Sequence, residues 1–310
     1  MAKIYLRPIG GLGARLIPLL QVMSAVRESP HELVVCWPLT SKPGKARSGS
    51  SREQSFEIGL SDLYDFDPPV TEISEEGYLA KTEDLPHYPL KHTQNLDGNG
   101  QTPVYLREHW DEDFCVDAHG LFQFISRDAR ATEPSALLLA YLDLFRLKPP
   151  QKALYDDFME RFEVERPKVG VYLRQSRGAN YQVLEWDARN TLLPTMRKCV
   201  EQWDVPPLFF VVCDEEPLLN EVITEFGTEN VVTTPKPHIV NHPDEMLSIT
   251  VDIELMRRVD IYYPTWGSWL GKLMGLVRWD GTTINRGVLG VGAPANPLEW
   301  GYGIEGDRGS

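Results

Sequence analysis

The stretch VGVYLRQSRG (169–178) decides the fold of the second half of this chain. Its apolar residues alternate with smaller or polar ones, a pattern that predicts a buried β-strand ending at Arg174. In a parallel α/β sheet, ligands bind beyond the carboxyl ends of the strands, and a guanidinium matches phosphate oxygens with a rigid fork of donors. Arg174, together with Arg177, therefore predicts a phosphate or diphosphate site. An ordinary strand end with solvated arginines is the alternative.

A regular alternation of helices and strands follows this stretch. Apolar periodicity predicts strands at 208–213, 230–234 and 260–264, and helices at about 191–203, 216–227, 244–259 and 268–277. Such alternation predicts a parallel, doubly wound sheet with right-handed crossovers.

The chain begins with a similar unit. Residues 3–7 predict a strand, PIGGLGAR a glycine loop, 15–29 a helix with Pro18 in its first turn, and 32–37 a second strand. Residues 50–135 are acidic and rich in turns, and 86–103 has the composition of a loop. Helices are expected at 135–147 and 151–162. We therefore expect an α/β protein with two Rossmann-like domains facing a cleft, at 1–150 and 151–300, and a flexible tail at 301–310.

Composition narrows the function. The 310 residues are 42% hydrophobic and 25% charged, as in ordinary globular proteins, and the formal net charge of −14 argues against a general nucleic-acid binder. The apolar runs are too short for a membrane span, and the N-terminus lacks a signal-peptide pattern, so we expect a cytoplasmic protein. The four cysteines are far apart in sequence and favour neither a zinc site nor a disulfide framework.

The glycine loop GGLGAR (10–15) is the first of four further polar features. Glycines between a strand and a helix let backbone N–H groups approach an anion, which suggests roles for Gly10, Gly11, Gly13 and Arg15. The dinucleotide fingerprint is incomplete because Leu16 occupies its last position. NAD binding is therefore a minor alternative.

Three features lie near the predicted strand ends of the second half. Asp214 and Glu215 follow the strand at 208–213; Asp214 is also a candidate helix cap. Asp252 lies in an apolar helix pattern, so it needs a partner, either an arginine or a ligand hydroxyl. The segment PTWGSWLG (264–271) combines a strand end with a helix start, and such a start favours anions.

The order of these motifs resembles the GT-B fucosyltransferases, which include α1,6-fucosyltransferases, nodulation-factor fucosyltransferases and protein O-fucosyltransferases. Their C-terminal domains carry a strand ending in HxRR, a strand with a T-D-D-P-like turn, an LDI helix, and an S/T-x-S-S-like helix start. The matching stretches are VGVYLRQSRG, VVCDEEPLL, TVDIELMRRVDIYY and PTWGSWLGKL, with an opening that is similar to GGLGARLIPLLQVMSAVRESPHELVVCW. Residues 50–150 match poorly.

The resemblance implies a role for each matching residue. Arg174 corresponds to the essential phosphate-binding arginine, which makes it the predicted catalytic residue. Tyr172 and Gln175 depart from the family's His and second Arg, and Arg177 is placed to compensate. The predicted nucleotide-sugar site comprises Gly10, Gly11, Gly13, Arg15, Tyr172, Gln175, Arg177, Asp214, Glu215, Asp252, Thr265, Trp266, Gly267 and Ser268.

The resemblance thus implies an inverting, metal-independent glycosyltransferase without a cofactor. The donor is a nucleotide sugar, GDP-fucose as the first choice, bound by the C-terminal domain; the N-terminal domain binds a glycan or another hydroxyl acceptor. The absence of a DxD-type acidic pair agrees with metal independence. Two alternatives remain open: a nucleotide-sugar or glycan binder of the same fold without turnover, and a Rossmann oxidoreductase that binds its cofactor at Gly10–Arg15.

Overall fold

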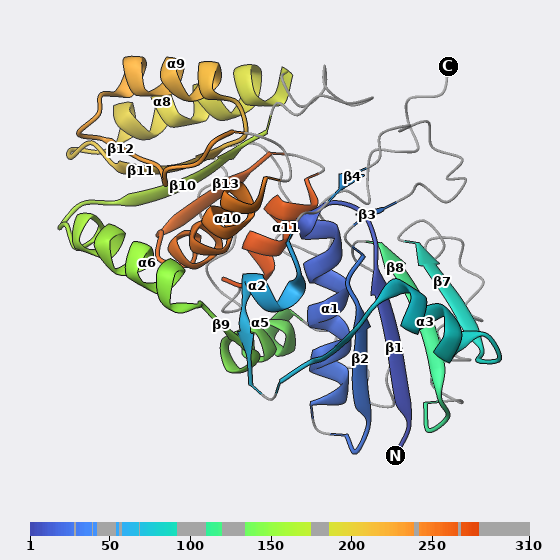
Figure 1. Cartoon of the computed structure of the whole chain (residues 1–310). Coiled ribbons are helices and arrows are strands. Elements are labelled where there is room, and N and C mark those ends of the chain that lie inside the picture. Colours follow the sequence, from blue (N-terminus) through green and yellow to red (C-terminus); the bar gives the residue numbers. More distant parts are fainter. Residues whose placement is uncertain are drawn as a thin grey trace. The chain divides into compact units, whose positions relative to one another are not determined.

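The computed structural model describes residues 1–27, 29–38, 40–41, 54–55, 58–67, 69–91, 110–119, 134–174, 186–238, 242–265 and 268–278. These residues form two compact units, the first ending at Arg146 and the second beginning at Leu147. Each unit contains its own parallel sheet with helices packed against it (Figure 1).

The first unit is built on a five-stranded parallel sheet with strand order β6-β2-β1-β8-β7. Its strands are β1 (Lys3–Pro8), β2 (Glu32–Cys36), β6 (Thr71–Ile73), β7 (His87–Lys91) and β8 (Phe114–His119). Its helices are α1 (Leu12–Val26), α2 (Leu60–Leu63), α3 (Glu75–Thr82) and α5 (Pro134–Leu144). Two short pairs, β3 (Thr40–Ser41) with β4 (Gln54–Ser55) and β5 (Asp65–Phe66) with β9 (Phe145–Arg146), are antiparallel.

Two details of the first unit differ from the sequence prediction. Helix α1 begins at Leu12, so Pro18 lies inside the helix rather than in its first turn. Because proline has no N–H, the carbonyl of Ala14 lacks its helical partner. Strand β7 lies within the predicted loop at 86–103. A strand at the edge of the sheet tolerates Pro89, which explains why a proline-containing segment forms one.

The second unit has a four-stranded parallel sheet with order β12-β11-β10-β13. Its strands are β10 (Lys168–Leu173), β11 (Leu208–Cys213), β12 (Val231–Val232) and β13 (Ile261–Pro264). Its helices are α6 (Pro149–Phe162), η3 (Ala188–Leu192), α8 (Leu193–Gln202), α9 (Glu216–Phe226), α10 (Pro243–Met256) and α11 (Trp269–Leu276). Helices α8 and α9 cover one face and α6 and α10 the other (Figure 1), the doubly wound arrangement that the sequence predicts.

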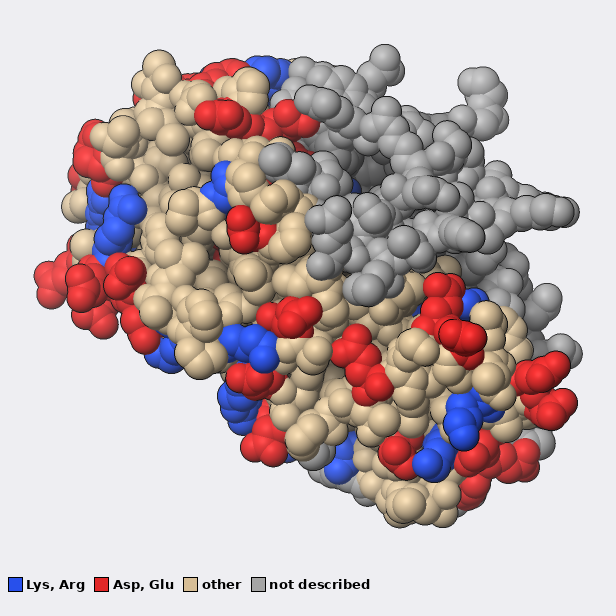
Figure 2. Space-filling model, in the orientation of Figure 1, with Lys and Arg blue, Asp and Glu red and all other residues tan. Residues whose placement is uncertain are grey.

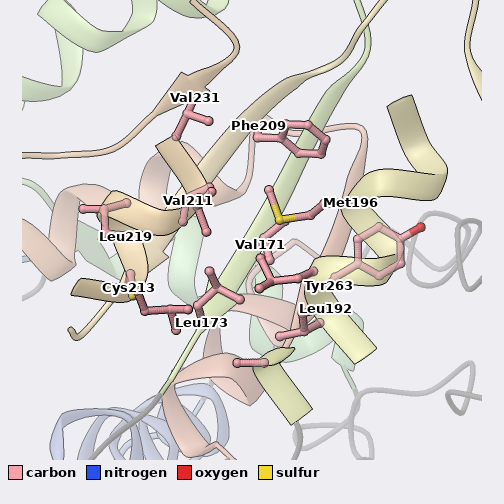
Figure 3. Packing of buried hydrophobic residues seen from close by; sticks show 14 of the residues in the cluster. Val171, Leu173, Leu192, Met196, Phe209, Val211, Cys213, Leu219, Val231 and Tyr263 are labelled. Carbon is pink, nitrogen blue, oxygen red and sulfur yellow. The ribbon is translucent and has the colours of Figure 1, made fainter. Parts of the chain in front are cut away.

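The core of the second unit contains the apolar residues of β10. Val169, Val171 and Leu173 pack with Phe209, Val211 and Cys213 of β11 against the helices on one face; Figure 3 shows Met196 and Leu192 beside Val171. On the opposite face, Gly170 lets α10 approach the sheet closely. A Cβ atom there would lie 2.2 Å from Met256 Sδ and 2.8 Å from Val259 Cγ2.

Charged side chains of both signs are interspersed over the face of the molecule in Figure 2. Within the described residues, no helix combines the length and the apolar character that crossing a membrane requires. All four cysteines are buried free thiols.

Candidate functional site

The candidate site lies at the carboxyl edge of the second sheet. The chain adds β11 and β12 on one side of β10 and then returns to place β13 on the other side. The order of strands therefore reverses between β10 and β13, and open α/β sheets bind ligands at such a switch point. Arg174 follows β10 there, and Thr265 follows β13.

Thr265 connects the ends of these two strands. Its Oγ1 accepts a hydrogen bond from the main-chain N–H of Arg174 at 2.8 Å and donates one to the carbonyl of Tyr172. The main-chain N–H of Thr265 also donates to this carbonyl, at 2.9 Å. Because Thr265 is only 2% exposed, these bonds form in a dry environment and fix the point at which Arg174 leaves the sheet.

The arginine side chain is directed to the start of α11. Arg174 Nη1 donates to Ser268 Oγ at 3.3 Å, and Ser268 is the N-cap residue of the helix, accepting from the N–H of Gly271. The guanidinium thus lies next to the positive end of a helix dipole, and its side chain is about one third exposed. A permanent cation and a helix N-terminus together favour an anion, as a diphosphate would be.

Asp214 and Glu215 lie beside the arginine, at the end of β11. Asp214 Oδ2 is 3.9 Å from Arg174 Nε, so the carboxylate forms a long ion pair with the guanidinium. The expectation that Asp214 caps α9 is wrong: Glu215 is the N-cap residue, and its side chain makes no capping hydrogen bond to the helix. Cys213 Sγ donates to the carbonyl of Glu215 at 3.2 Å, which holds the turn in place.

Tyr172 is buried in the sheet on the α11 side, where its ring lies 3.2 Å from the position of a Cβ on Gly271. Burial raises the pKa of its phenol to about 12, opposed by the charge of Arg174. The phenol is therefore neutral at physiological pH, and it interacts with the Ser268 side chain at the position where the family resemblance has a histidine.

Asp252 has a different partner from the arginine that the sequence suggested. Its carboxylate is fully buried in α10, where it accepts a hydrogen bond from Thr234 Oγ1 at 2.5 Å and forms an ion pair with Lys236. Lys236 Nζ is also buried, so each charge compensates the other in the interior. Sequence reasoning missed this lysine; the signal was its position between two prolines just after β12.

Glu245 is a second buried carboxyl beside this pair. Its Oε2 accepts from the N–H of His238 at 3.0 Å, and His238 has a positive φ of 54°. Burial raises the pKa of Glu245 to about 7; the positive charge of Lys236 opposes this rise and the negative charge of Asp252 adds to it. The positive charge of Lys236 therefore acts on the carboxyl groups of both Asp252 and Glu245. The Glu245 carboxyl also binds the main chain at His238, where the backbone is strained.

The N-terminal glycine loop lies in the first unit, and the buried side chain of Arg15 holds it through hydrogen bonds. Gly10 has a φ of 95°, which only glycine adopts readily, and Gly11 is the N-cap residue of α1, which also contains Gly13. Arg15, expected to face a ligand, is fully buried instead: Nε donates to the Gly10 carbonyl at 2.8 Å, and Nη1 to that of Pro38 at 2.6 Å. The guanidinium also lies over the ring of Trp37.

Four of the predicted site residues, Gln175, Arg177, Trp266 and Gly267, lie outside the described residues. Within the described ranges, His, Cys, Asp and Glu side chains form no group of three or more that could hold a metal ion. The structure therefore brings together Arg174, Tyr172, Thr265, Ser268 and Asp214.

Comparison with known proteins places this geometry in context. The sequence matches no protein family model, and no curated protein matches it. Solved structures do match. The NodZ α-1,6-fucosyltransferase soaked with GDP-fucose aligns over 89% of this chain and 93% of its own, with a TM-score of 0.55 and 15% identity. The crystal of NodZ from Bradyrhizobium aligns over 88% and 92%, with a TM-score of 0.53 and 16% identity.

A plant enzyme shows the same likeness. A mutant of FUT1 from Arabidopsis thaliana in complex with GDP aligns over 89% of this chain and 68% of its own, with a TM-score of 0.54 and 11% identity. At these identities the likeness concerns the fold, and it confirms the α/β fold class predicted from the sequence. The chain therefore has the fold of the GT-B fucosyltransferases.

Proposed function

We propose that this protein is an inverting glycosyltransferase that transfers a sugar from a nucleotide-sugar donor to a hydroxyl group of a glycan or small molecule. The observation that carries the proposal is the position of Arg174 at the switch point between β10 and β13, beside the N-terminus of α11. GDP-fucose is the first choice of donor, because NodZ structures with the same fold contain GDP-fucose or GDP.

The residues of the site would act on the leaving group. The acceptor oxygen attacks the anomeric carbon from the side opposite the diphosphate and loses its hydroxyl proton to solvent, while the electrons of the breaking C–O bond pass to the diphosphate. Arg174 and the N-terminus of α11 would stabilise the negative charge that develops there, and such preorganised stabilisation is commonly the largest contribution to catalysis. We propose that this fixed positive charge makes the reaction independent of a metal ion.

Thermal shift tests the donor site. GDP, UDP, TDP, CMP, GDP-fucose and NAD would be compared on the wild type, on Arg174→Ala and on Arg197→Ala as a matched control. Arg197 is an exposed arginine of α8 that pairs with Glu225 in the same unit. We expect GDP and GDP-fucose to raise the melting temperature of the wild type and of the control, and Arg174→Ala to abolish the shift.

Turnover is tested separately by measuring GDP release from GDP-fucose with a panel of hydroxyl acceptors. Removing Arg174 should lower the rate by on the order of 10²–10³-fold, as the loss of a single charge-stabilising donor does in other enzymes. GDP binding without release would identify a sugar-nucleotide binder without turnover. Stabilisation by NAD alone would instead support the oxidoreductase.

A further inference from the structure

Asp117 in the first unit is surrounded by hydrogen-bond donors. Its Oδ1 accepts from Arg7 Nε at 2.8 Å and from the Tyr78 hydroxyl at 3.0 Å. Its Oδ2 pairs with Arg7 Nη2 and lies 3.1 Å from His87 Nε2. Burial disfavours the charged form, yet the bonds from Arg7 hold the pKa of Asp117 below its usual value. Arg7 and Tyr78 therefore supply three hydrogen bonds to the carboxylate, and the His87 ring lies within ion-pair distance of Oδ2.

This arrangement orients the ring of His87. With Nε2 directed at the Asp117 carboxylate, Nδ1 is the ring nitrogen left for a ligand, and a sugar hydroxyl can either donate to it or accept from it. The side chain is 47% exposed, so a ligand can reach it. Because Arg7 and Tyr78 hold the Asp117 carboxylate in place, the carboxylate orients the His87 ring and directs Nε2 away from a ligand.

His87 lines a cavity of about 530 Å³, within the range of roughly 300–1,000 Å³ typical of small-molecule sites. The cavity lies within the first unit. Its wall combines polar side chains with an apolar surface formed by Leu79, Ala80, Leu85 and Cys115. A pyranose has the same two-sided character, with an apolar face of C–H groups and a rim of hydroxyls.

The charges around the cavity favour a neutral ligand. Arg7 lines it, but this guanidinium is bound to Asp117 and lies 3.7 Å from Glu75. Glu83 also lines it. An anionic ligand would therefore meet a carboxylate and an arginine whose charge is already compensated, which disfavours phosphates and carboxylates.

We propose that this cavity binds a neutral saccharide, with one hydroxyl hydrogen-bonded to Nδ1 of His87 and the apolar face of the sugar ring against Leu79 and Leu85. The proposal rests on the proposed function, in which this saccharide is part of the acceptor. His87 is a binding residue here, and Asp117 is a positioning residue that fixes the ring.

Saturation-transfer NMR on the full chain tests it, with methyl β-D-glucopyranoside, methyl β-D-galactopyranoside and methyl β-D-glucuronide as probes. His87→Phe keeps the ring and removes both nitrogens, and Leu79→Glu adds a charge at an exposed position. His242→Asn is the matched control, because His242 is another exposed histidine, 3.8 Å from Asp244. A neutral glycoside should bind the wild type and the control, and its affinity should fall about fivefold to tenfold in His87→Phe, as loss of one hydrogen bond implies.

Three results would overturn the proposal: unchanged binding in both His87→Phe and Leu79→Glu, equal binding of the glucuronide, or no binding of either neutral glycoside at millimolar concentration. The GDP thermal shift of the same samples separates this proposal from the proposed function. A GDP shift without glycoside binding refutes the cavity alone. Glycoside binding that depends on His87, without any nucleotide shift, refutes the donor site and leaves the cavity standing.

Discussion

The hydroxyl of Thr265 accepts a hydrogen bond from the main-chain N–H of Arg174 and donates one to the carbonyl of Tyr172, so a single side chain joins the ends of β13 and β10. The reversal of strand order lies between these two strands. The position of Arg174 therefore depends on a buried hydroxyl as much as on the strand that carries it.

Replacing Thr265 with valine should displace Arg174 while keeping the side-chain shape. The N–H of Arg174 would lose its buried acceptor, a loss of about 1–3 kcal/mol in the free energy of unfolding, measurable by urea denaturation. We expect GDP affinity, measured by calorimetry, to fall as well. Thr265→Ser retains the hydroxyl and should preserve both quantities; if serine and valine behave alike, the hydroxyl does not hold the arginine.

Glu245 should make stability depend on pH. Its folded pKa of about 7 exceeds the ordinary glutamate pKa of 4.5, so the folded state binds its proton more tightly than the unfolded state does. The contribution of the Glu245 carboxyl to the free energy of unfolding is complete below about pH 4.5. It declines by on the order of 3 kcal/mol as the pH rises through about 7.

Denaturant unfolding at pH 5 and pH 7.5 measures this effect. Glu245→Gln stays neutral at both values, so the stability difference between variant and wild type should shift in favour of the variant at the higher pH. Glu216→Gln, at an exposed position in α9, is the control and should show no such shift. An equal difference at both pH values would contradict the buried titration.

The ion pair of Lys236 with Asp252 should show strong coupling. Lys236→Met leaves a buried carboxylate without its cation and should cost about 3–5 kcal/mol of stability. Asp252→Asn removes the charge instead, and the double variant should be more stable than the sum of the two losses predicts. The measurement is a double-mutant cycle by urea unfolding. Strict additivity would show that the pair does not interact.

Gly170 should tolerate no side chain. An alanine Cβ would overlap Met256 Sδ, and since Met256 is fully buried, either its side chain or α10 must shift, at a cost of about 1–3 kcal/mol. Gly77→Ala is the comparison, because its Cβ would meet the Ser74 hydroxyl at 3.2 Å in a helix where alanine is preferred, so the change should stay within about 1 kcal/mol. Thermal unfolding measures the loss of stability in both variants, and equal losses would contradict the close packing of α10 on Gly170.

Much of the fold was predictable because the decisive signals are local. The apolar alternation that ends at Arg174 and the helix start at Ser268 specify a strand end and a cap without knowledge of the partner strands. The alternation of helices and strands then indicates a parallel sheet, although the order of β10, β11 and β13 comes from the structure. This is why the position of Arg174 at the carboxyl end of a strand could be predicted from a short stretch of sequence.

The errors come from residues whose roles depend on distant contacts. Arg15 belongs to a glycine loop, and the sequence therefore suggested that it binds a ligand. Its guanidinium instead donates to the carbonyl of Pro38, which follows β2. The partner of Asp252 is a lysine 16 residues earlier, and only the fold brings the two together. The cluster around Asp117 likewise joins three strands and α3, and no motif in the sequence marks it.

The link between Arg174 and Thr265 spans 91 residues of chain. Contacts of such long range form late, because closing the loop costs entropy before any bond repays it. During synthesis, β10 leaves the ribosome long before β13 can join it. A chain that stops before Ser268 thus lacks the helix start that the Arg174 side chain contacts, and the diphosphate affinity proposed above would report that the second unit has finished folding.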